Sequence, residues 1–273
     1  MTTRRAIILA RGLGTRMRAP DPSVQLTPEQ LRAANAGVKP MMPLNGRPFL
    51  DFILSSLADA GIPRVALVVA PDHAALRRYY EVDAPPTRVR VDFVVQSEAL
   101  GTANAVLAAE AWLEGEPFLV MNADNLYPVA VLRELASLSG AGLPAFEAEE
   151  LVASSNIPPE RIGSFAILDV DERQGLIGIV EKPADLPSPH LSPEGGKLIS
   201  MNCWRFDQGI FKACRDVPIS ARGEFELPEA VGVAVRHGAR FKTFRAHGPV
   251  LDLSTRADAA DVARRLAGTS PRP

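Results

Sequence analysis

The chain has 273 residues, of which 47% are hydrophobic and 23% charged, and its formal net charge is -2. This composition is typical of a globular protein long enough to bury a sizeable core. The near-neutral charge provides no global attraction to nucleic acid or to an anionic membrane, so an anionic substrate would need a local cationic site.

The sequence contains no recognisable membrane or secretion signal. No apolar run reaches the roughly 18 residues of a membrane span, and the apolar run that ends at Arg11 is too short for a signal-peptide core. Cys203 and Cys214 have no metal-ligand spacing, so we expect two reduced thiols, one in a strand and one in a helix. These features favour a cytoplasmic protein that binds neither membrane nor nucleic acid.

Apolar runs and segments of helical spacing alternate through the first half of the chain. In chain order they predict a strand at 6–10, a helix at 48–60, a strand at 65–70, a helix at 71–80, strands at 89–95 and 118–121 around a helix at 101–113, and a helix at 128–138. Wholly apolar strands separated by helices predict a parallel sheet covered on both faces. Ligands of such sheets bind at the carboxyl ends of the strands.

The second half has a different pattern, which predicts a small α+β extension of the same domain. A hairpin-like pair at 163–170 and 176–180 precedes a strand at 198–206, a helix at 225–237, a strand at 241–246 and a helix at 256–266. The proline-rich stretch 183–196 is predicted to be a loop, and the tail 268–273 to be disordered.

A glycine-containing loop follows the first predicted strand. Gly12 and Gly14 would let the backbone approach a ligand closely, and successive N–H groups there can bind phosphate oxygens. Arg16 and Arg18 add charge that does not titrate. The loop lacks the third glycine of a dinucleotide fingerprint and the Gly-Lys-Ser/Thr of a Walker A loop. An ordinary strand-to-helix turn and another kind of phosphate loop both remain open for this segment alone.

Further segments, taken in order with this loop, resemble the sugar-phosphate nucleotidylyltransferase family, which includes glucose-1-phosphate thymidylyl-, uridylyl- and adenylyltransferases. The resemblance covers about residues 5 to 266. The segments that carry it are Gly12 to Arg18, Lys39-Pro40, Gln96 with 100–103, Asn122-Ala123-Asp124, Gly163, Glu181-Lys182-Pro183, Met201-Asn202 and Asp252 with 253–255.

The resemblance implies an α/β fold with a Rossmann-like, mostly parallel central sheet, helices on both faces and a small α+β sugar-binding extension. We expect a single domain over 1–267, with a nucleotide-binding half at 1–140 and a sugar-phosphate-binding half at 141–267. The implied reaction joins a nucleoside triphosphate, with dTTP or UTP favoured, to a sugar 1-phosphate and releases pyrophosphate. The family also allows self-association into a homo-oligomer.

The resemblance also implies roles for individual residues. Arg16, Lys39, Asp124 and Lys182 would be catalytic, and Mg²⁺ would bind Asp124 and Asp252, because Mg²⁺ prefers hard oxygen ligands. The nucleotide would contact Ala10, Gly12, Gly14, Thr15, Arg16, Gln96, Gly101 and Thr102. The sugar phosphate would contact Asn122, Gly163, Glu181, Lys182 and Asn202, with Gly163 opening the strand under the sugar.

Several segments depart from the family pattern, among them the Met-Asn-Ala run before Asp124, where versions containing Gly-Asp are more usual. Arg11 stands where a small residue is usual, and 19–36 is longer than expected, with a capping-box pattern from Thr27 to Gln30 that predicts a short lid helix. Asp252 is followed by Leu-Ser-Thr rather than glycine and threonine. In isolation, Asp124 and Asp252 also fit ordinary residues before a helix, and Glu181 with Lys182 fits a solvated pair.

Two other classes of function remain open beside the enzyme. A glycosyltransferase on a similar sheet would usually carry Asp-x-Asp, whereas Asn122-Ala123-Asp124 lacks the first aspartate. A catalytically silent regulatory subunit that binds a nucleotide sugar would have no need of Arg16, Lys39, Asp124 and Lys182 together.

Overall fold

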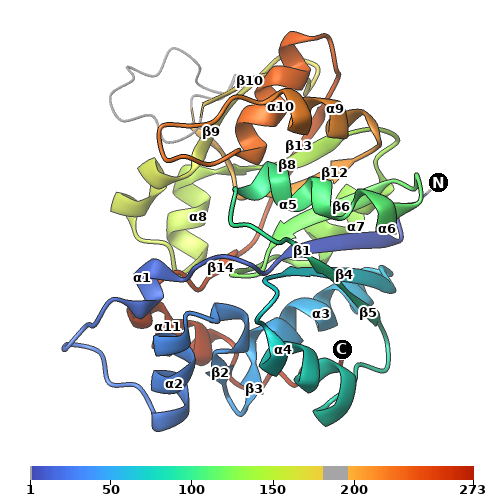
Figure 1. Ribbon diagram of the computed structural model, residues 1–273. Helices are drawn as coiled ribbons and strands as arrows, with labels where there is room; N and C mark the ends of the chain where they lie inside the picture. Colours follow the sequence, from blue (N-terminus) through green and yellow to red (C-terminus); the bar gives the residue numbers. More distant parts are fainter. Residues whose placement is uncertain (1, 181–195) are drawn as a thin grey trace.

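A computed structural model describes residues 2–180 and 196–273 of the chain (Figure 1). Its strands are β1 Arg5–Leu9, β2 Pro43–Leu44, β3 Arg47–Pro48, β4 Arg64–Val69, β5 Arg90–Val95, β6 Phe118–Asn122, β7 Asn125–Leu126, β8 Gly142–Glu147, β9 Ala166–Val170, β10 Leu176–Val180, β11 Leu198–Ser200, β12 Cys203–Phe206, β13 Lys242–Ala246 and β14 Leu251–Asp252.

The described α-helices lie between these strands or after the last of them. They are α1 Thr15–Arg18, α2 Pro28–Ala36, α3 Phe49–Asp59, α4 Ala74–Arg78, α5 Thr102–Ala108, α6 Glu110–Leu113, α7 Val129–Ser137, α8 Ala148–Ser154, α9 Gly209–Asp216, α10 Leu227–Arg236 and α11 Arg256–Arg265. Two 3₁₀ helices, Lys39–Met41 and Pro159–Ser164, and a π-helical turn, Tyr79–Asp83, complete the helical segments.

One sheet of ten strands forms the centre of the molecule. Its order is β10-β9-β11-β8-β12-β6-β1-β4-β5, and β13 pairs with β8. The strands from the first half, β6, β1, β4 and β5, are parallel, as their wholly apolar runs predict. The second half continues the same sheet, chiefly with antiparallel pairs. The predicted α/β fold is therefore confirmed.

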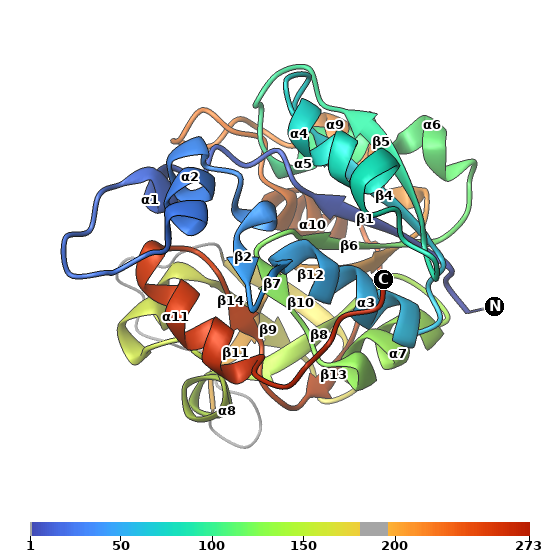
Figure 2. The same cartoon turned by 90° about the horizontal axis from the view of Figure 1, so that it is seen from below.

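Alternate residues of the strands divide the core between the two faces of the sheet. In β1, Ala6 and Ile8 belong to one buried cluster and Ile7 to the other, as the twofold alternation of a strand requires. Helices α3 and α7 cover the first face, whereas α5, α9 and α10 cover the second. Figures 1 and 2 show this layering from two directions. Both faces are thus shielded, which leaves the strand ends as the place for a ligand.

Several predicted elements differ in their bounds. The helix predicted at 71–80 begins only at Ala74 and continues as the π-helical turn. The strand predicted at 198–206 is two strands, because Asn202 has φ of 56°, a left-handed conformation that interrupts an extended run. The prediction that Gly163 opens a strand is wrong: it lies in the 3₁₀ helix Pro159–Ser164, and β9 begins at Ala166.

The C-terminal tail does not match the expected disorder. The carbonyl of Pro273 accepts hydrogen bonds from the backbone N–H groups of Thr87 and Arg88, at 2.9 and 3.1 Å. The backbone N–H of Arg272 donates to the hydroxyl of Ser55 at 3.1 Å. These backbone contacts fix a segment whose composition gives no folding signal of its own.

Candidate active site

The glycine loop leaves β1 and enters the short helix α1. Gly14 has φ of 63°, and a Cβ there would lie 2.3 Å from the carbonyl oxygen of Gly37, so only glycine fits. A Cβ at Gly12 would meet nothing within 4 Å, which leaves open space beside the loop. The loop therefore packs at Gly14 against the backbone of Gly37, just before Lys39. Its side at Gly12 stays free for a ligand.

A buried arginine from the far end of the chain fixes the region after the glycine loop. Arg256 donates to the carbonyl oxygens of Met17 and Arg18 at 2.9 and 3.0 Å, and to Oδ1 of Asn35 at 2.8 Å. These bonds tie α11 to α1 and to α2.

The predicted capping box at the start of α2 is confirmed. The Thr27 hydroxyl accepts from the Gln30 N–H at 3.2 Å, and Gln30 Oε1 accepts from the Thr27 N–H at 3.1 Å.

Two adjoining cavities open at the carboxyl ends of the parallel strands. The first has a volume of about 240 Å³ and the second about 280 Å³. Both are lined by Leu9, Lys39, Thr102, Asn122, Asp124 and Glu224. Most of the predicted nucleotide residues line the first cavity, and most of the predicted sugar and metal residues line the second. The shared wall is thus where groups bound in the two cavities would meet.

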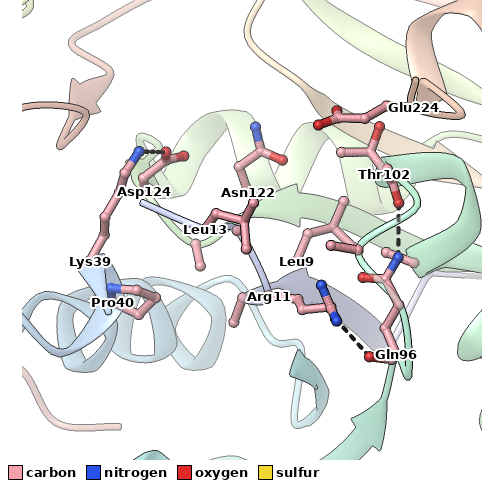
Figure 3. Close-up of a pocket in the computed structure, with 16 residues that line it drawn as sticks. Leu9, Arg11, Leu13, Lys39, Pro40, Gln96, Thr102, Asn122, Asp124 and Glu224 are labelled. Atoms are coloured by element: carbon pink, nitrogen blue, oxygen red, sulfur yellow. Dashed lines mark hydrogen bonds and ion pairs between the residues drawn. The ribbon is translucent and has the colours of Figure 1, made fainter. Parts of the chain in front are cut away.

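Lys39 and Asp124 form an ion pair in this shared wall. Nζ of Lys39 lies 2.9 Å from Oδ2 of Asp124, and the two side chains are 18% and 25% exposed. Figure 3 shows the pair on one side of the first cavity, away from Gln96. Lys39 begins a 3₁₀ helix, and Asp124 follows the end of β6. The prediction that these two residues share one site is supported by this contact.

The second carboxylate reaches the site through a small antiparallel pair of strands. β14 pairs with β7, with Asp252 opposite Asn125, which directly follows Asp124 in the chain. Asp252 is only 3% exposed and forms an ion pair with Arg161, while Asn125 Nδ2 donates to its Oδ2 at 3.1 Å. Burial and then the charge of Asp124 raise the pKa of Asp252, against the opposing effect of Arg161.

The two carboxylates fit a divalent cation that also binds substrate. Asp124 and Asp252 both line the second cavity, and the charge of Asp124 is strong enough at Asp252 to raise its pKa. No group of three or more His, Cys, Asp or Glu residues in 2–180 and 196–273 could hold a metal unaided. Mg²⁺ commonly takes one or two carboxylates and completes its shell with phosphate oxygens and water. The donor set therefore suits Mg²⁺ bound together with a nucleotide.

Gln96 and Gly101 face each other at the far end of the first cavity. Gln96 is 4% exposed, and its Nε2 donates to the carbonyl of Gly101 at 3.0 Å and to Oδ1 of Asn104 at 2.8 Å. Both amide hydrogens are therefore used, and Oε1 is the group that can accept from a ligand. Gly101 has φ of 100°, and a Cβ there would lie 2.5 Å from the carbonyl oxygen of Phe225.

The remaining predicted residues divide into three groups. Ala10, Gly12, Thr102, Asn122 and Asn202 line one or both cavities. The hydroxyl of Thr102 accepts from the N–H of Leu227 at 2.8 Å, which anchors the start of α10. Gly14, Thr15 and Gly163 line neither cavity. Glu181 and Lys182 lie outside the described residues, so the roles predicted for them remain predictions.

Arg16 and Arg161 both line the second cavity and have different surroundings. Arg16 is exposed, and no hydrogen bond or ion pair involves its side chain within the described ranges. Arg161 pairs with both Asp252 and Asp258, the latter at 2.9 Å. Sequence reasoning missed Arg161, because its contact with Asp252 spans 91 positions and leaves no local spacing pattern.

Comparison with known proteins agrees with this fold. The arrangement defines a nucleotidyltransferase-like α/β protein. Residues 5–255 match the Nucleotidyl transferase family, and the chain belongs to that family. No helix of the described ranges is long and apolar enough to cross a membrane.

Two relatives span most of the chain. A UTP–glucose-1-phosphate uridylyltransferase, AglF of Haloferax volcanii, is 26% identical over 96% of this chain and 96% of its own length. A glucose-1-phosphate thymidylyltransferase of Actinoplanes sp. is 26% identical over 93% of this chain and 75% of its own length. The resemblance inferred from the motifs is thus confirmed at the level of the family.

Two solved structures share the fold. A UDP-glucose pyrophosphorylase complexed with UDP-glucose has a TM-score of 0.74 at 17% identity and covers 98% of this chain and 100% of its own. A UTP-bound UGPase from Acinetobacter baumannii also has a TM-score of 0.74, at 19% identity, and covers 99% of this chain and 95% of its own. At these identities the likeness supports the fold alone.

Proposed function

We propose that the chain condenses a nucleoside triphosphate, UTP or dTTP, with a sugar 1-phosphate to give a nucleotide sugar and pyrophosphate. The observation that carries this proposal is the Lys39–Asp124 pair in the wall between two adjoining cavities. The nucleoside would occupy the first cavity and the sugar phosphate the second. The α-phosphorus would then lie beside the shared wall, where the two substrates meet.

The proposed step needs charge compensation more than acid–base chemistry. An ionised oxygen of the sugar phosphate bonds to the α-phosphorus, and the bond from that phosphorus to the bridging oxygen breaks. Pyrophosphate leaves on the side opposite the attacking oxygen and takes the electron pair of the broken bond, and no proton is transferred. Holding two anions in this geometry is the main task of the protein. Arg16 and Lys39 provide cationic groups of this chain for the triphosphate.

Asp124 and Asp252 are the residues proposed to hold Mg²⁺. When bound, the cation supplies positive charge to the phosphate oxygens as negative charge moves to the leaving group. Asp124 can be approached from the shared wall, where its side chain is 25% exposed. Asp252 is held in position by Arg161 and Asn125 before any cation arrives. The Lys39 ammonium would then be released from Asp124 toward phosphate.

The preference for a pyrimidine with an imide N–H rests on Gln96. Its Oε1 can accept from the N3–H of uracil or thymine, and Gly101 lines the same cavity, where its backbone N–H would serve a base carbonyl. The relatives named above, a uridylyltransferase and a thymidylyltransferase, support the same choice. The sugar would contact Asn122 and Asn202 in the second cavity.

The test is pyrophosphate release measured over a grid of nucleoside triphosphates and sugar 1-phosphates with Mg²⁺. We expect release only when both substrates are present, with UTP or dTTP giving the highest kcat/KM. No release from a folded sample that binds UTP would contradict the catalytic proposal and favour a nucleotide-sugar-binding regulator.

A further inference from the structure

Arg11 is a further cation beside the glycine loop, and its side chain points toward Gln96, away from Lys39 and Asp124. It follows β1, and its guanidinium reaches toward the end of β5. Nε of Arg11 donates to the carbonyl of Gln96 at 2.7 Å, and Nη2 donates to the carbonyl of Ser97 at 3.0 Å. Figure 3 shows Arg11 beside Gln96 in the first cavity, whereas Lys39 and Asp124 lie on the opposite side.

The charge of Arg11 has no acidic partner within the described ranges. Its hydrogen-bond acceptors are neutral carbonyls, and no ion pair involves it there. The charge of Arg11 also acts on the neighbouring His73. The pKa of His73 is lowered first by burial, which Asp72 opposes, and then by the charges of Arg11 and Arg77. A guanidinium with an uncompensated charge thus lines a cavity whose other walls are largely apolar: Leu9, Ala10, Leu13, Pro40, Ala99 and Ala105.

The fixed geometry limits Arg11 as a phosphate ligand. Backbone carbonyls already use its donors on Nε and Nη2, which is one of the two paired edges of the guanidinium, so only the edge formed by Nη1 and Nη2 is left for a phosphate. Arg16, in contrast, is exposed at the second cavity and has its fork available. The planar face of Arg11 also remains open to a ligand of the first cavity, and guanidinium planes stack on aromatic rings.

We propose that Arg11 is the stacking platform for the nucleobase, and this inference rests on the proposed function of the two cavities. Two hydrogen bonds hold the plane in place before the nucleotide arrives, so little side-chain freedom is lost on binding. Every base has a flat π-face, so stacking supplies affinity and discriminates little between bases. Arg11 therefore strengthens nucleotide binding, while the polar edge groups of Gln96 and Gly101 select the base.

The proposal separates base binding from phosphate binding, so its test compares ligands with and without a base. Calorimetry with Mg²⁺ would measure the Kd of UTP, ATP and inorganic triphosphate for the wild-type protein, Arg11→Met and Arg11→Lys. The exposed Arg240→Met, outside both cavities, is the matched control. We expect Arg11→Met to weaken UTP and ATP about 10-fold each, with inorganic triphosphate within about twofold.

Arg11→Lys keeps the charge and loses the plane, so it should resemble Arg11→Met, whereas Arg240→Met should match the wild type. An equal loss for inorganic triphosphate would overturn the proposal and make Arg11 a phosphate ligand. Full rescue by lysine would also overturn it, because charge alone would then suffice. A change in the UTP-to-ATP affinity ratio would instead make Arg11 a brace for Gln96. Failure of the wild-type protein to bind any nucleotide would contradict the proposed function itself.

Discussion

The two carboxylates proposed to hold the metal are presented by the protein in different ways. Asp124 follows a strand of the parallel sheet, is 25% exposed and, among the described residues, has one ion pair, with Lys39. Asp252 comes from a two-residue strand of the second half, is 3% exposed and contacts both Arg161 and Asn125. One carboxylate can exchange its partner for a cation at low cost, whereas the other is fixed in advance.

This difference teaches how a site can be both responsive and preorganised. A buried carboxylate needs compensation before the metal binds, and Arg161 supplies it at Asp252. An accessible carboxylate needs less, so a flexible lysine suffices at Asp124. We therefore propose that Asp124 exchanges Lys39 for the metal ion, and that Arg161 holds Asp252 in position for the same ion.

The largest expected effect is that of removing the responsive carboxylate. Asp124→Ala should lower kcat by at least about 10³-fold, because charge on the phosphates would no longer be balanced at the shared wall. Steady-state pyrophosphate release measures this loss, and circular dichroism checks the fold. Asp72→Ala, an exposed carboxylate after the neighbouring strand β4, is the matched control and should keep wild-type turnover. Wild-type turnover by Asp124→Ala would remove the metal role assigned here.

Neutralising the fixed carboxylate should have a smaller effect. Asp252→Asn keeps the shape and can still accept from Asn125, so we expect a loss in kcat/KM of about 10²-fold and a weaker response to Mg²⁺. The fold should survive, because Arg161 retains Asp258 at 2.9 Å. A titration of activity against Mg²⁺ concentration checks this. Equal losses for Asp252→Asn and Asp124→Ala would erase the distinction between the two carboxylates.

Removing the cation that fixes Asp252 should cost less activity and more stability. Arg161→Met leaves two largely buried carboxylates, Asp252 and Asp258, without their shared partner. We expect kcat/KM to fall about 10-fold and the Tm to drop by a few degrees, for about 1–2 kcal/mol. Differential scanning calorimetry without metal measures the shift. Added Mg²⁺ should recover part of the lost stability, and an unchanged Tm would show that the pair fixes nothing.

The smallest expected effect is a dependence of stability on pH that is specific to Asp252. Because burial and then Asp124 raise its pKa, the folded state favours the protonated carboxyl more than the unfolded chain does. Its contribution to stability is fully present below the pKa of the unfolded chain, about 3.9, and is lost as pH rises through the raised folded value. The Tm of the wild type minus the Tm of Asp252→Asn, measured without metal, should therefore fall as pH rises from about 4. A rise of this signed difference with pH would contradict the raised pKa.

The sequence predicts the parallel half of the fold better than the rest. An apolar run such as 65–70 is buried on both faces of the sheet, so its residues alone mark it as a strand. The observed strand, β4, is shifted from the predicted bounds by one residue at each end. The strand β8 was missed, because Gly142 and Pro144 interrupt the apolar pattern that would indicate a strand. It forms by pairing with β11, β12 and β13, which are distant in sequence. The split at Asn202 was also missed, since its φ of 56° interrupts a run whose sequence pattern predicts one strand.

The site divides along a similar line. Gly12, Lys39, Gln96 and Asp124 were predicted from motifs in which local chain geometry carries the chemistry, and the structure brings them to one pair of cavities. Arg161 could not be predicted, because its role exists only when residues 91 positions apart become neighbours.

The most direct test of the account is to follow one reaction mixture by phosphorus NMR. With Mg²⁺, UTP and glucose 1-phosphate, the account predicts that a nucleotide sugar and pyrophosphate appear in equal amounts, and that neither forms when one substrate is left out. Release of orthophosphate, or products from UTP alone, would contradict transfer of the nucleotidyl group between the two cavities.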